Sequence, residues 1–195
     1  MGRVPLGDLA AAPELNFDLE GKGQVWTAVR LKSAPVKPDL SAWSSGGFGL
    51  ARDFTVAAPE PGRPVADRFR RGQVVRASIT LVVPEARYNV VLEDHVPAGF
   101  EPVNFNLADA DRTLLDLVDP GDSDEYGRRF WYDHQEIWPD RVAVYADYLG
   151  PGVYTFNYLA RAATPGRYLT PGPRAEEMYA PENAGRGAGQ VIVVE

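Results

Sequence analysis

The sequence predicts an all-β fold, an antiparallel β-sandwich of at least seven strands with long loops and little helix. Segments rich in β-branched and aromatic residues recur along the chain, and Gly/Pro-rich turns separate them. The 17 prolines are spread along the 195 residues, and each removes a backbone N–H that a helix interior needs. With 45% apolar and 24% charged residues, the chain has the composition of a globular domain rather than of a disordered one.

Six segments carry the strand signal: residues 24–32, 73–83, 88–93, 141–149, 153–162 and 190–195. Side chains on a strand alternate between its faces, so a period of two marks the buried side. One face of the fourth segment carries Val142, Val144, Ala146 and Tyr148. One face of the fifth segment carries Tyr154, Phe156, Tyr158 and Ala160. The short Gly150-Pro151-Gly152 turn between these two segments predicts that they form an antiparallel hairpin.

Helix signals are few in this chain. Residues 109–119 predict two helical turns, and residues 174–178 predict one. Three stretches predict long loops: 32–47, 57–72 and 107–127. The third loop holds seven acidic residues against one basic residue, which favours a solvated insertion.

A calcium site in the acidic loop is the functional alternative to a solvated insertion. Residues 122–127 resemble the start of an EF-hand loop, but Tyr126 stands at the third ligand position, and Asp133 replaces the usual bidentate Glu at the twelfth. The two histidines, His95 and His134, are too few for a mononuclear histidine site, which needs three or four convergent ligands. We therefore expect no metal and no cofactor, and we expect His95 to lie at the end of a strand.

Several classes of function lack their sequence signals. The net charge of −7 disfavours duplex nucleic acid as a partner, since such binding depends on Lys and Arg neutralising phosphates. No apolar run approaches the roughly 20 residues of a membrane span. The chain has no Cys, so it forms no disulfide and no thiolate nucleophile, and it lacks a G-x-S-x-G elbow. The residues by themselves favour a binding or structural module over an enzyme.

Four motifs in the second half of the chain, taken in their order and spacing, resemble a known family. The first two are residues 94–101, DHVPAGFE, and residues 140–147, DRVAVYAD. The last two are residues 158–168, YLARAATPGRY, and residues 175–181, AEEMYAP, which Gly185-Arg186 follows. They are similar to the C-terminal macroglobulin-like domain of the bacterial α2-macroglobulins, large extracytoplasmic proteins that trap proteases.

The resemblance extends to residues 21–26, which look like the G-x-G-x-x-W strand of that domain. It therefore implies a β-sandwich of the macroglobulin/immunoglobulin-like type over residues 21–195, with residues 1–20 as the tail of a preceding domain or a linker. Departures from the family pattern are small: Val96 replaces a Leu, and residues 121–126 lengthen a variable loop.

The family resemblance implies a non-catalytic function in protease trapping. A target protease cuts a bait segment elsewhere in the full chain, and in thioester-bearing members a Cys–Gln thioester in a helical domain then links the protease covalently. The last domain packs against that helical domain and helps to keep the thioester from water. The implied partners are the other domains of the parent chain, above all the helical thioester domain, and target proteases through the parent. The implied location is periplasmic or extracytoplasmic, with a secreted or membrane-anchored parent.

Residues 176–181 are the predicted partner-facing site, and its members are Glu176, Met178, Tyr179 and Pro181. Prolines flank this stretch and limit the conformations that it loses on docking. Met178 and Tyr179 admit two interpretations, core packing or an exposed apolar anchor for a partner domain. The alternative function is a free-standing carbohydrate-binding or adhesive β-sandwich, which the 11% aromatic content favours and which would present coplanar exposed rings.

Overall fold

The computed structural model describes residues 20–24, 26, 39–57, 66–105, 107, 112–118 and 130–195. The chain divides into two compact units, Met1–Val36 and Lys37–Glu195, and every assigned strand lies in the second unit. Most of the predicted strand at 24–32 and most of the predicted loop at 107–127 lie outside the described residues. The domain boundary that the sequence places after residue 20 stays a prediction.

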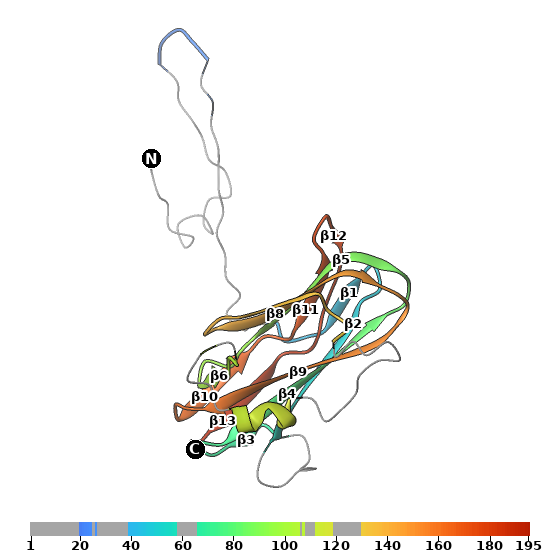
Figure 1. The fold of residues 1–195 in the computed structure, drawn as a ribbon. Coiled ribbons are helices and arrows are strands. Elements are labelled where there is room, and N and C mark those ends of the chain that lie inside the picture. Colours follow the sequence, from blue (N-terminus) through green and yellow to red (C-terminus); the bar gives the residue numbers. More distant parts are fainter. Residues whose placement is uncertain are drawn as a thin grey trace. The chain divides into compact units, whose positions relative to one another are not determined.

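Thirteen strands are assigned among the described residues, and they build three sheets (Figure 1). The six-stranded sheet contains, in spatial order, β1 (Trp43–Ser45), β12 (Ala180–Arg186), β11 (Arg174–Glu177), β5 (Arg87–His95), β8 (Arg141–Leu149) and β7 (His134–Ile137). The four-stranded sheet contains β2 (Gly49–Val56), β4 (Val74–Val83), β9 (Gly152–Ala162) and β6 (Phe100–Pro102). The three-stranded sheet contains β10 (Gly166–Thr170), β13 (Gln190–Val194) and β3 (Arg68–Phe69). Each of these strand pairs is antiparallel except β13 with β3.

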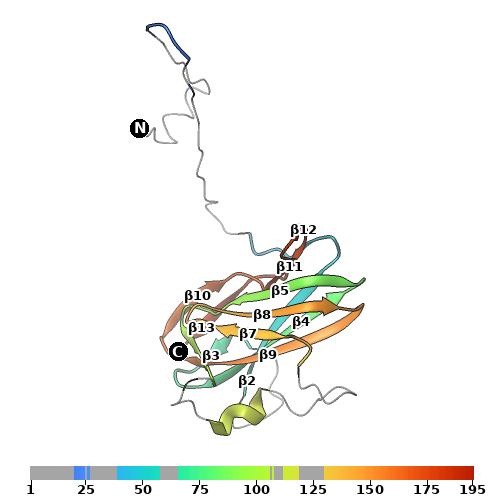
Figure 2. The same cartoon turned by 45° about the horizontal axis from the view of Figure 1, so that its top comes forward.

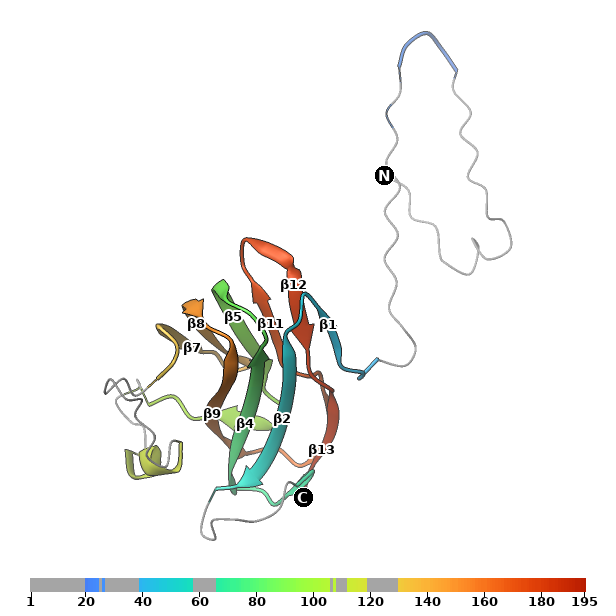
Figure 3. The ribbon, with the colours of Figure 1, turned by 90° about the vertical axis from the view of Figure 1, so that its right-hand side faces the viewer.

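The two larger sheets face each other as the layers of a sandwich, with β5 and β8 over β4 and β9 (Figure 2, Figure 3). The predicted all-β antiparallel fold is thereby confirmed. One 3₁₀ helix, η1 (Arg112–Leu117), lies within the stretch where the sequence predicts two helical turns. Among the described residues, no helix combines the length and the apolar character that crossing a bilayer requires. The short strands β1 and β3 lie inside stretches that the sequence predicts as loops.

The core lies between the layers, and along β4 the buried residues follow a period of two. In β4, which the sequence predicts as a strand, alternate residues from Val75 to Val83 are buried. In β9, Phe156, Tyr158 and Ala160 are buried on the predicted face. Local alternation therefore identifies the core-facing side of both central strands.

Three phenylalanines join the edges of the sheets within this core. Phe54 of β2, Phe69 of β3 and Phe100 of β6 meet edge to face, with ring centroids 5.4–6.4 Å apart. Because β2 and β6 are the two edges of the four-stranded sheet, the trio links both edges to the three-stranded sheet.

The predicted hairpin of residues 141–149 and 153–162 is wrong. β8 pairs with β5 and β7 in the six-stranded sheet, whereas β9 pairs with β4 and β6 in the four-stranded sheet. The turn between them carries the chain from one layer to the other, and there the Tyr154 hydroxyl donates to the Gly150 carbonyl at 2.8 Å. Each strand turns one apolar face to the same core, so the alternation fits a crossing between layers as well as it fits a hairpin.

The predicted buried face of β8 is correct for three of its four residues, but Tyr148 is exposed. The ladder between β5 and β8 pairs Tyr88 with Tyr148 and then Val90 with Ala146. Asn89, in the interval, has a φ of +50°. This irregularity reverses which side chains point inward, so Tyr88 and Tyr148 face solvent.

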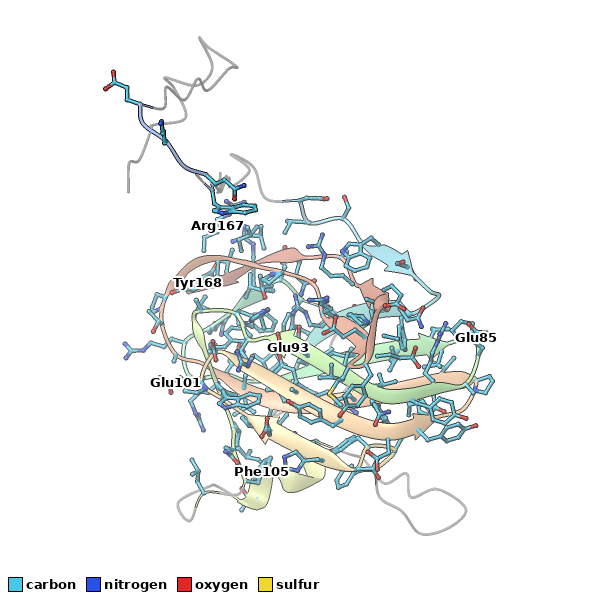
Figure 4. All side chains as sticks on the ribbon, turned by 90° about the horizontal axis from the view of Figure 1, so that it is seen from above. Glu85, Glu93, Glu101, Phe105, Arg167 and Tyr168 are labelled. Atoms are coloured by element: carbon cyan, nitrogen blue, oxygen red, sulfur yellow. The ribbon has the colours of Figure 1, made fainter. Side chains whose placement is uncertain are left out.

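The turn at residues 97–99 returns the chain to the core. The Phe100 N–H donates back across the turn at 2.8 Å, and the Phe100 ring is buried. Tyr168 of β10 (Figure 4) covers Gly99, where a Cβ would lie 2.2 Å from the tyrosine ring. The Tyr168 hydroxyl donates to two carbonyls of the turn before β10, at 3.0 and 3.1 Å. The ring is thus held in place over a position where only glycine leaves room.

Gly99→Ala is expected to lower the free energy of unfolding by about 1–3 kcal/mol, because the new methyl group must displace the Tyr168 ring. A series of urea denaturation curves measures the loss. Gly150→Ala is the matched control, since its Cβ would meet no atom beyond its chain neighbours closer than 3.7 Å. Equal unfolding midpoints for the two variants would show that the contact between Gly99 and Tyr168 does not constrain the turn.

Candidate interaction site

The predicted site lies on a β-hairpin. Where the sequence predicts a helical turn at 174–178, the chain forms β11, which pairs with β5 on one side and β12 on the other. Pairing on both sides and the burial of Ala175 override the helical propensity of Ala, Glu and Met. Met178 and Tyr179 form the two-residue connection to β12, and we call these two residues the hairpin tip.

The hairpin tip is exposed, and the hairpin projects beyond the neighbouring strands (Figure 1). Tyr179 is 85% exposed and Met178 is 43% exposed, so neither lies in the core of this chain. Just below the tip, the Met178 N–H donates to the Asn89 carbonyl at 2.9 Å. Pro181 lies in residues 181–183, where the pairing between β11 and β12 shifts register. Of the two interpretations of the tip, this exposure favours the apolar anchor.

Glu177 holds the base of the hairpin. Its Oε1 accepts the Tyr88 N–H of β5 at 2.8 Å, and its Oε2 accepts Asn183 Nδ2 of β12 at 2.6 Å. Partial burial acts to raise the pKa of Glu177, but these hydrogen bonds and the charge of Arg87 together hold that pKa below its usual value. The residue is therefore a carboxylate at neutral pH and bridges the strands on either side of β11.

Arg87 supplies the positive charge at this base. Its Nη1 lies 3.5 Å from Glu177 Oε2. Its Nη2 donates to the Gly46 carbonyl and, at 2.7 Å, to Glu85 on the turn before β5 (Figure 4). The guanidinium lies 5.5 Å from the centre of the Phe48 ring. The base of the hairpin is thus joined to the segments before β2 and before β5.

Three of the four predicted site residues lie at or next to the hairpin tip, and the fourth, Glu176, makes its contact away from the tip. Met178 and Tyr179 form the tip and Pro181 follows them, but the Glu176 carboxylate bonds to Arg174 of its own strand. No sequence pattern predicted the residues that hold the hairpin, namely Glu177, Arg87 and Asn183. Tyr88 and Glu177 are 89 residues apart in the chain, so no local pattern joins them.

An exposed aromatic pair lies beside the hairpin base. Tyr88 and Tyr148 pack with ring centroids 5.2 Å apart and planes tilted by 52°. A sugar-binding platform needs coplanar exposed rings, and this pair does not form one. Phe130 and Tyr132 stack at 25°, but the partly buried Tyr132 also packs edge to face on Phe156 of the core. These two pairs therefore give the carbohydrate-binding alternative no support.

A buried ionic centre crosses the core, and the sequence analysis did not predict it. Arg52 of β2 donates to Asp94 Oδ1 of β5, and the Tyr158 hydroxyl of β9 donates to Asp94 Oδ2 at 2.8 Å. Burial raises the pKa of Asp94, whereas the Arg52 charge and the Tyr158 hydroxyl act to lower it. Burial and the Asp94 charge raise the pKa of Tyr158 well above its usual value, so this hydroxyl stays a neutral donor. All three side chains are buried, which makes the centre a support for the fold.

The two histidines each lie beside one glutamate. His95 ends β5, as the sequence predicts, and its Nε2 lies 3.5 Å from Glu93 Oε1. His134 begins β7, and its Nε2 lies 3.6 Å from Glu136 Oε1. In the part of the chain that the structure describes, no three His, Asp or Glu side chains gather to hold a metal ion. Most of the calcium-like stretch, residues 122–133, lies outside that part.

Comparison with known proteins assigns this geometry to a family. A family model described as "Bacterial Alpha-2-macroglobulin MG10 domain" matches residues 47–182. The chain is 38% identical over 124 residues to an alpha-2-macroglobulin homolog of Nostoc sp., covering 64% of this chain and 6% of that protein. It is 32% identical over 162 residues to an alpha-2-macroglobulin of Xylella fastidiosa, covering 82% of this chain and 9% of that protein. The chain thus spans less than a tenth of the length of either relative.

Solved structures agree with the fold. Escherichia coli alpha-2-macroglobulin activated by porcine elastase aligns with a TM-score of 0.64 at 24% identity, over 80% of this chain and 14% of that chain. Salmonella alpha-2-macroglobulin reacted with methylamine aligns with a TM-score of 0.61 at 27% identity, over 80% of this chain and 10% of that chain. The match to the family model covers well over half of the chain and confirms the resemblance seen in the four sequence motifs. The chain therefore belongs to the bacterial α2-macroglobulin family and carries its MG10 macroglobulin domain.

Proposed function

We propose that this chain is a non-catalytic domain of a bacterial α2-macroglobulin-like protease inhibitor, in which it packs against the helical thioester domain and contributes to protease trapping. The observation that carries the proposal is the hairpin tip. Met178 and Tyr179 expose apolar surface at the end of a hairpin whose base is held by two hydrogen bonds and an ion pair. Because the tip is held before docking, little conformational entropy is lost when it binds a partner.

The chemistry of a thioester supports an apolar cover. A thioester survives while water is kept away from it, and two large side chains can exclude water from a bond of that size. The chain has no Cys, so the thioester would come from a C-x-E-Q segment of another domain. Two of the similar structures are described as alpha-2-macroglobulin activated by porcine elastase and by trypsin, which supports a link to proteases.

Family membership supports the remaining assignments. The full-length protein acts in the periplasm or outside the cell, as a secreted or membrane-anchored protein. It meets its target proteases through other domains, and we assign this domain no catalytic residue and no cofactor. Its direct partners are the other domains of the same protein.

Tyr179→Ala in the full-length inhibitor is expected to shorten the lifetime of the thioester. Truncating a buried anchor weakens docking by at least about 2 kcal/mol, or roughly 30-fold. Met178→Ala is expected to act in the same direction. In the 195-residue chain, both changes are expected to alter the free energy of unfolding by about 0.5 kcal/mol or less, because both side chains are exposed there. Release of free thiol measures the thioester, and urea denaturation measures the stability.

Leu169→Ala is the control for this experiment. Leu169 is an exposed apolar residue of β10. It follows Tyr168, which lies at the opposite end of the sandwich from Glu85 (Figure 4). Its truncation is expected to change neither the thioester lifetime nor the stability. If Tyr179→Ala unfolds the chain and leaves the thioester lifetime unchanged, Tyr179 supports the fold and has no covering role.

A further inference from the structure

We propose that Glu177 is a positioning residue, which together with Arg87 and Asn183 fixes the hairpin so that Met178 and Tyr179 are presented in one conformation. The inference rests on the proposed function and deepens it, because it assigns the order of the tip to a side chain that lies behind the docking surface. Glu177 acts through the tip and is not itself a contact for the partner domain.

The carboxylate of Glu177 connects three strands. Oε1 accepts the Tyr88 N–H of β5 at 2.8 Å, and Oε2 accepts Asn183 Nδ2 of β12 at 2.6 Å. Glu177 is itself the last residue of β11, the strand between β5 and β12. The next backbone bond toward the tip, from the Met178 N–H to the Asn89 carbonyl, is 2.9 Å long. The carboxylate therefore acts at the level where the hairpin leaves the sheet.

The backbone ladders are irregular at this same level. Between β11 and β12, the pairing moves from Glu176 with Ala184 to Glu177 with Ala180, so residues 181–183 bulge from β12. On the other side, Asn89 of β5 has a φ of +50°. A bulge leaves backbone groups without their ladder partners and bends the strand. One hydrogen bond of Glu177 reaches Tyr88, next to Asn89, and the other reaches Asn183 in the bulge. Side-chain hydrogen bonds therefore link the three strands where the backbone ladders are irregular.

Arg87 and a glycine turn keep the carboxylate in place. The Arg87 and Glu177 side chains are 8% and 12% exposed, and a pair so shielded from water is weakly screened. Gly46, with a φ of +75°, lies so close to Asn183 that a Cβ would be 2.5 Å from Asn183 Oδ1. Arg87 donates to the carbonyl of the same Gly46. The Gly46-Gly47 turn between β1 and β2 therefore packs tightly against the Asn183 side chain that Glu177 binds.

The neighbouring carboxylate provides a matched comparison. Glu176 bonds to Arg174 of its own strand, so it links no second strand through that contact. It is the neighbouring residue on β11 and carries the same charge as Glu177, but it has a different set of partners. Replacing Glu176 tests the loss of one negative charge near the tip, and replacing Glu177 tests the loss of the bridge.

The first test follows the hairpin in the 195-residue chain by nuclear magnetic resonance. The Tyr88 amide proton is expected to titrate with Glu177, with a midpoint below the usual range of glutamate because the pKa is lowered. Because the pKa of Glu177 is lower in the folded chain than in the unfolded chain, the stability that the bridge supplies is fully present above the unfolded-state pKa and is lost as the pH falls through the folded-state pKa. Glu177→Gln is expected to abolish the titration, and Glu177→Ala to speed exchange of the Met178 amide about tenfold. Glu176→Gln is expected to leave both signals unchanged.

The second test measures docking in the full-length inhibitor through the thioester lifetime. If the competent conformer of the tip falls to about a tenth of its population, docking weakens about tenfold. Glu177→Ala is expected to reach that effect, and Glu177→Gln a smaller one, because Gln keeps an acceptor for the Tyr88 N–H. If the Glu177 side chain only filled space, Glu177→Gln would have the same thioester lifetime as the wild type. Glu176→Ala is expected to leave the lifetime unchanged.

The outcomes separate the two proposals. If Tyr179→Ala shortens the thioester lifetime but a loosened Glu177→Ala hairpin does not, the positioning role is overturned and the proposed function stands. If Glu177→Ala loosens the hairpin and neither variant changes the lifetime, the docking function is overturned. Unchanged exchange of the Met178 amide in Glu177→Ala overturns the positioning role by itself. Should Glu177→Ala fail to fold, Asn183→Ala removes one of the two hydrogen bonds and is expected to speed that exchange several-fold.

Discussion

Asp94→Ala is expected to lower the free energy of unfolding by about 3–5 kcal/mol, because it leaves the buried Arg52 guanidinium without its carboxylate. The Arg52 side chain is fully buried, and among the described residues its Nη1 reaches, besides Asp94, only the His95 carbonyl, at 3.4 Å. In that same part of the chain, Arg52 Nε and Nη2 have no hydrogen-bond partner. An uncompensated charge in that position has no route to water. In a domain of this size, the loss corresponds to a fall in melting temperature of about 6–20 °C, which urea and thermal denaturation measure together.

Two controls isolate the charge at this centre. Asp53→Ala removes an exposed carboxylate next to Arg52 on β2, and its effect is expected to stay within about 0.5 kcal/mol. Replacing Arg52 by Met together with Asp94 by Leu removes both charges, and it is expected to recover much of the loss. An Asp94→Ala variant that unfolds within about 1 kcal/mol of the parent chain would contradict the account, since a charge left buried without a partner costs more than that.

The periodicity of single strands was predictable from the sequence. Phe156, Tyr158 and Ala160 of β9 lie on the expected buried face because that side of the strand packs against the core, and burial of one side favours alternation. The partner of each strand was not predictable in the same way. β8 and β9 turn apolar faces toward each other from opposite layers, and the same alternation describes two strands of one sheet.

The irregular positions escaped the sequence analysis for a physical reason. At Tyr148 the period breaks because Asn89, on the neighbouring strand, adopts a positive φ, and nothing near Tyr148 in the chain signals this. Residues 174–177 have good helix formers, but two flanking strands supply backbone partners for β11 on both sides. Tertiary pairing outweighs propensities that differ by only about 0.7 kcal/mol per residue.

Three of the four family motifs divide between two structural roles. Asp94, Gly99 and Tyr158 come from the first and third motifs, and they build the ionic centre and a packed turn in the interior. Met178 and Tyr179 come from the last motif and lie exposed on the hairpin tip. The motif alone predicted the tip and Glu176 as site residues, and it gave no sign of the contacts that Glu177 makes. The distinction between these neighbours depends on contacts with β5 and β12, which only the folded chain supplies.

The aromatic trio gives the second large effect on stability. Phe54→Ala is expected to lower the free energy of unfolding by about 3–5 kcal/mol, because it opens a cavity in the core. Phe54 is fully buried, and its ring centre lies 6.4 Å from that of Phe69 and 5.9 Å from that of Phe100. The Arg52 guanidinium lies 4.9 Å from the same ring, so the substitution also removes a contact of the ionic centre.

Two further variants test whether the loss of stability at Phe54 comes from lost core volume and whether truncating an exposed apolar side chain has the same effect. Phe54→Leu keeps much of the volume and is expected to lose less than about 1.5 kcal/mol, whereas Val153→Ala truncates a side chain that is 68% exposed and is expected to lose about 0.5 kcal/mol or less. Urea denaturation of the three variants under identical conditions measures all of these changes. Equal losses for Phe54→Leu and Phe54→Ala would show that edge-to-face contact of the rings, and not the filled volume, holds this part of the core. The predicted order, with Ala the most damaging at position 54, follows from a trio that links both edges of the four-stranded sheet to β3.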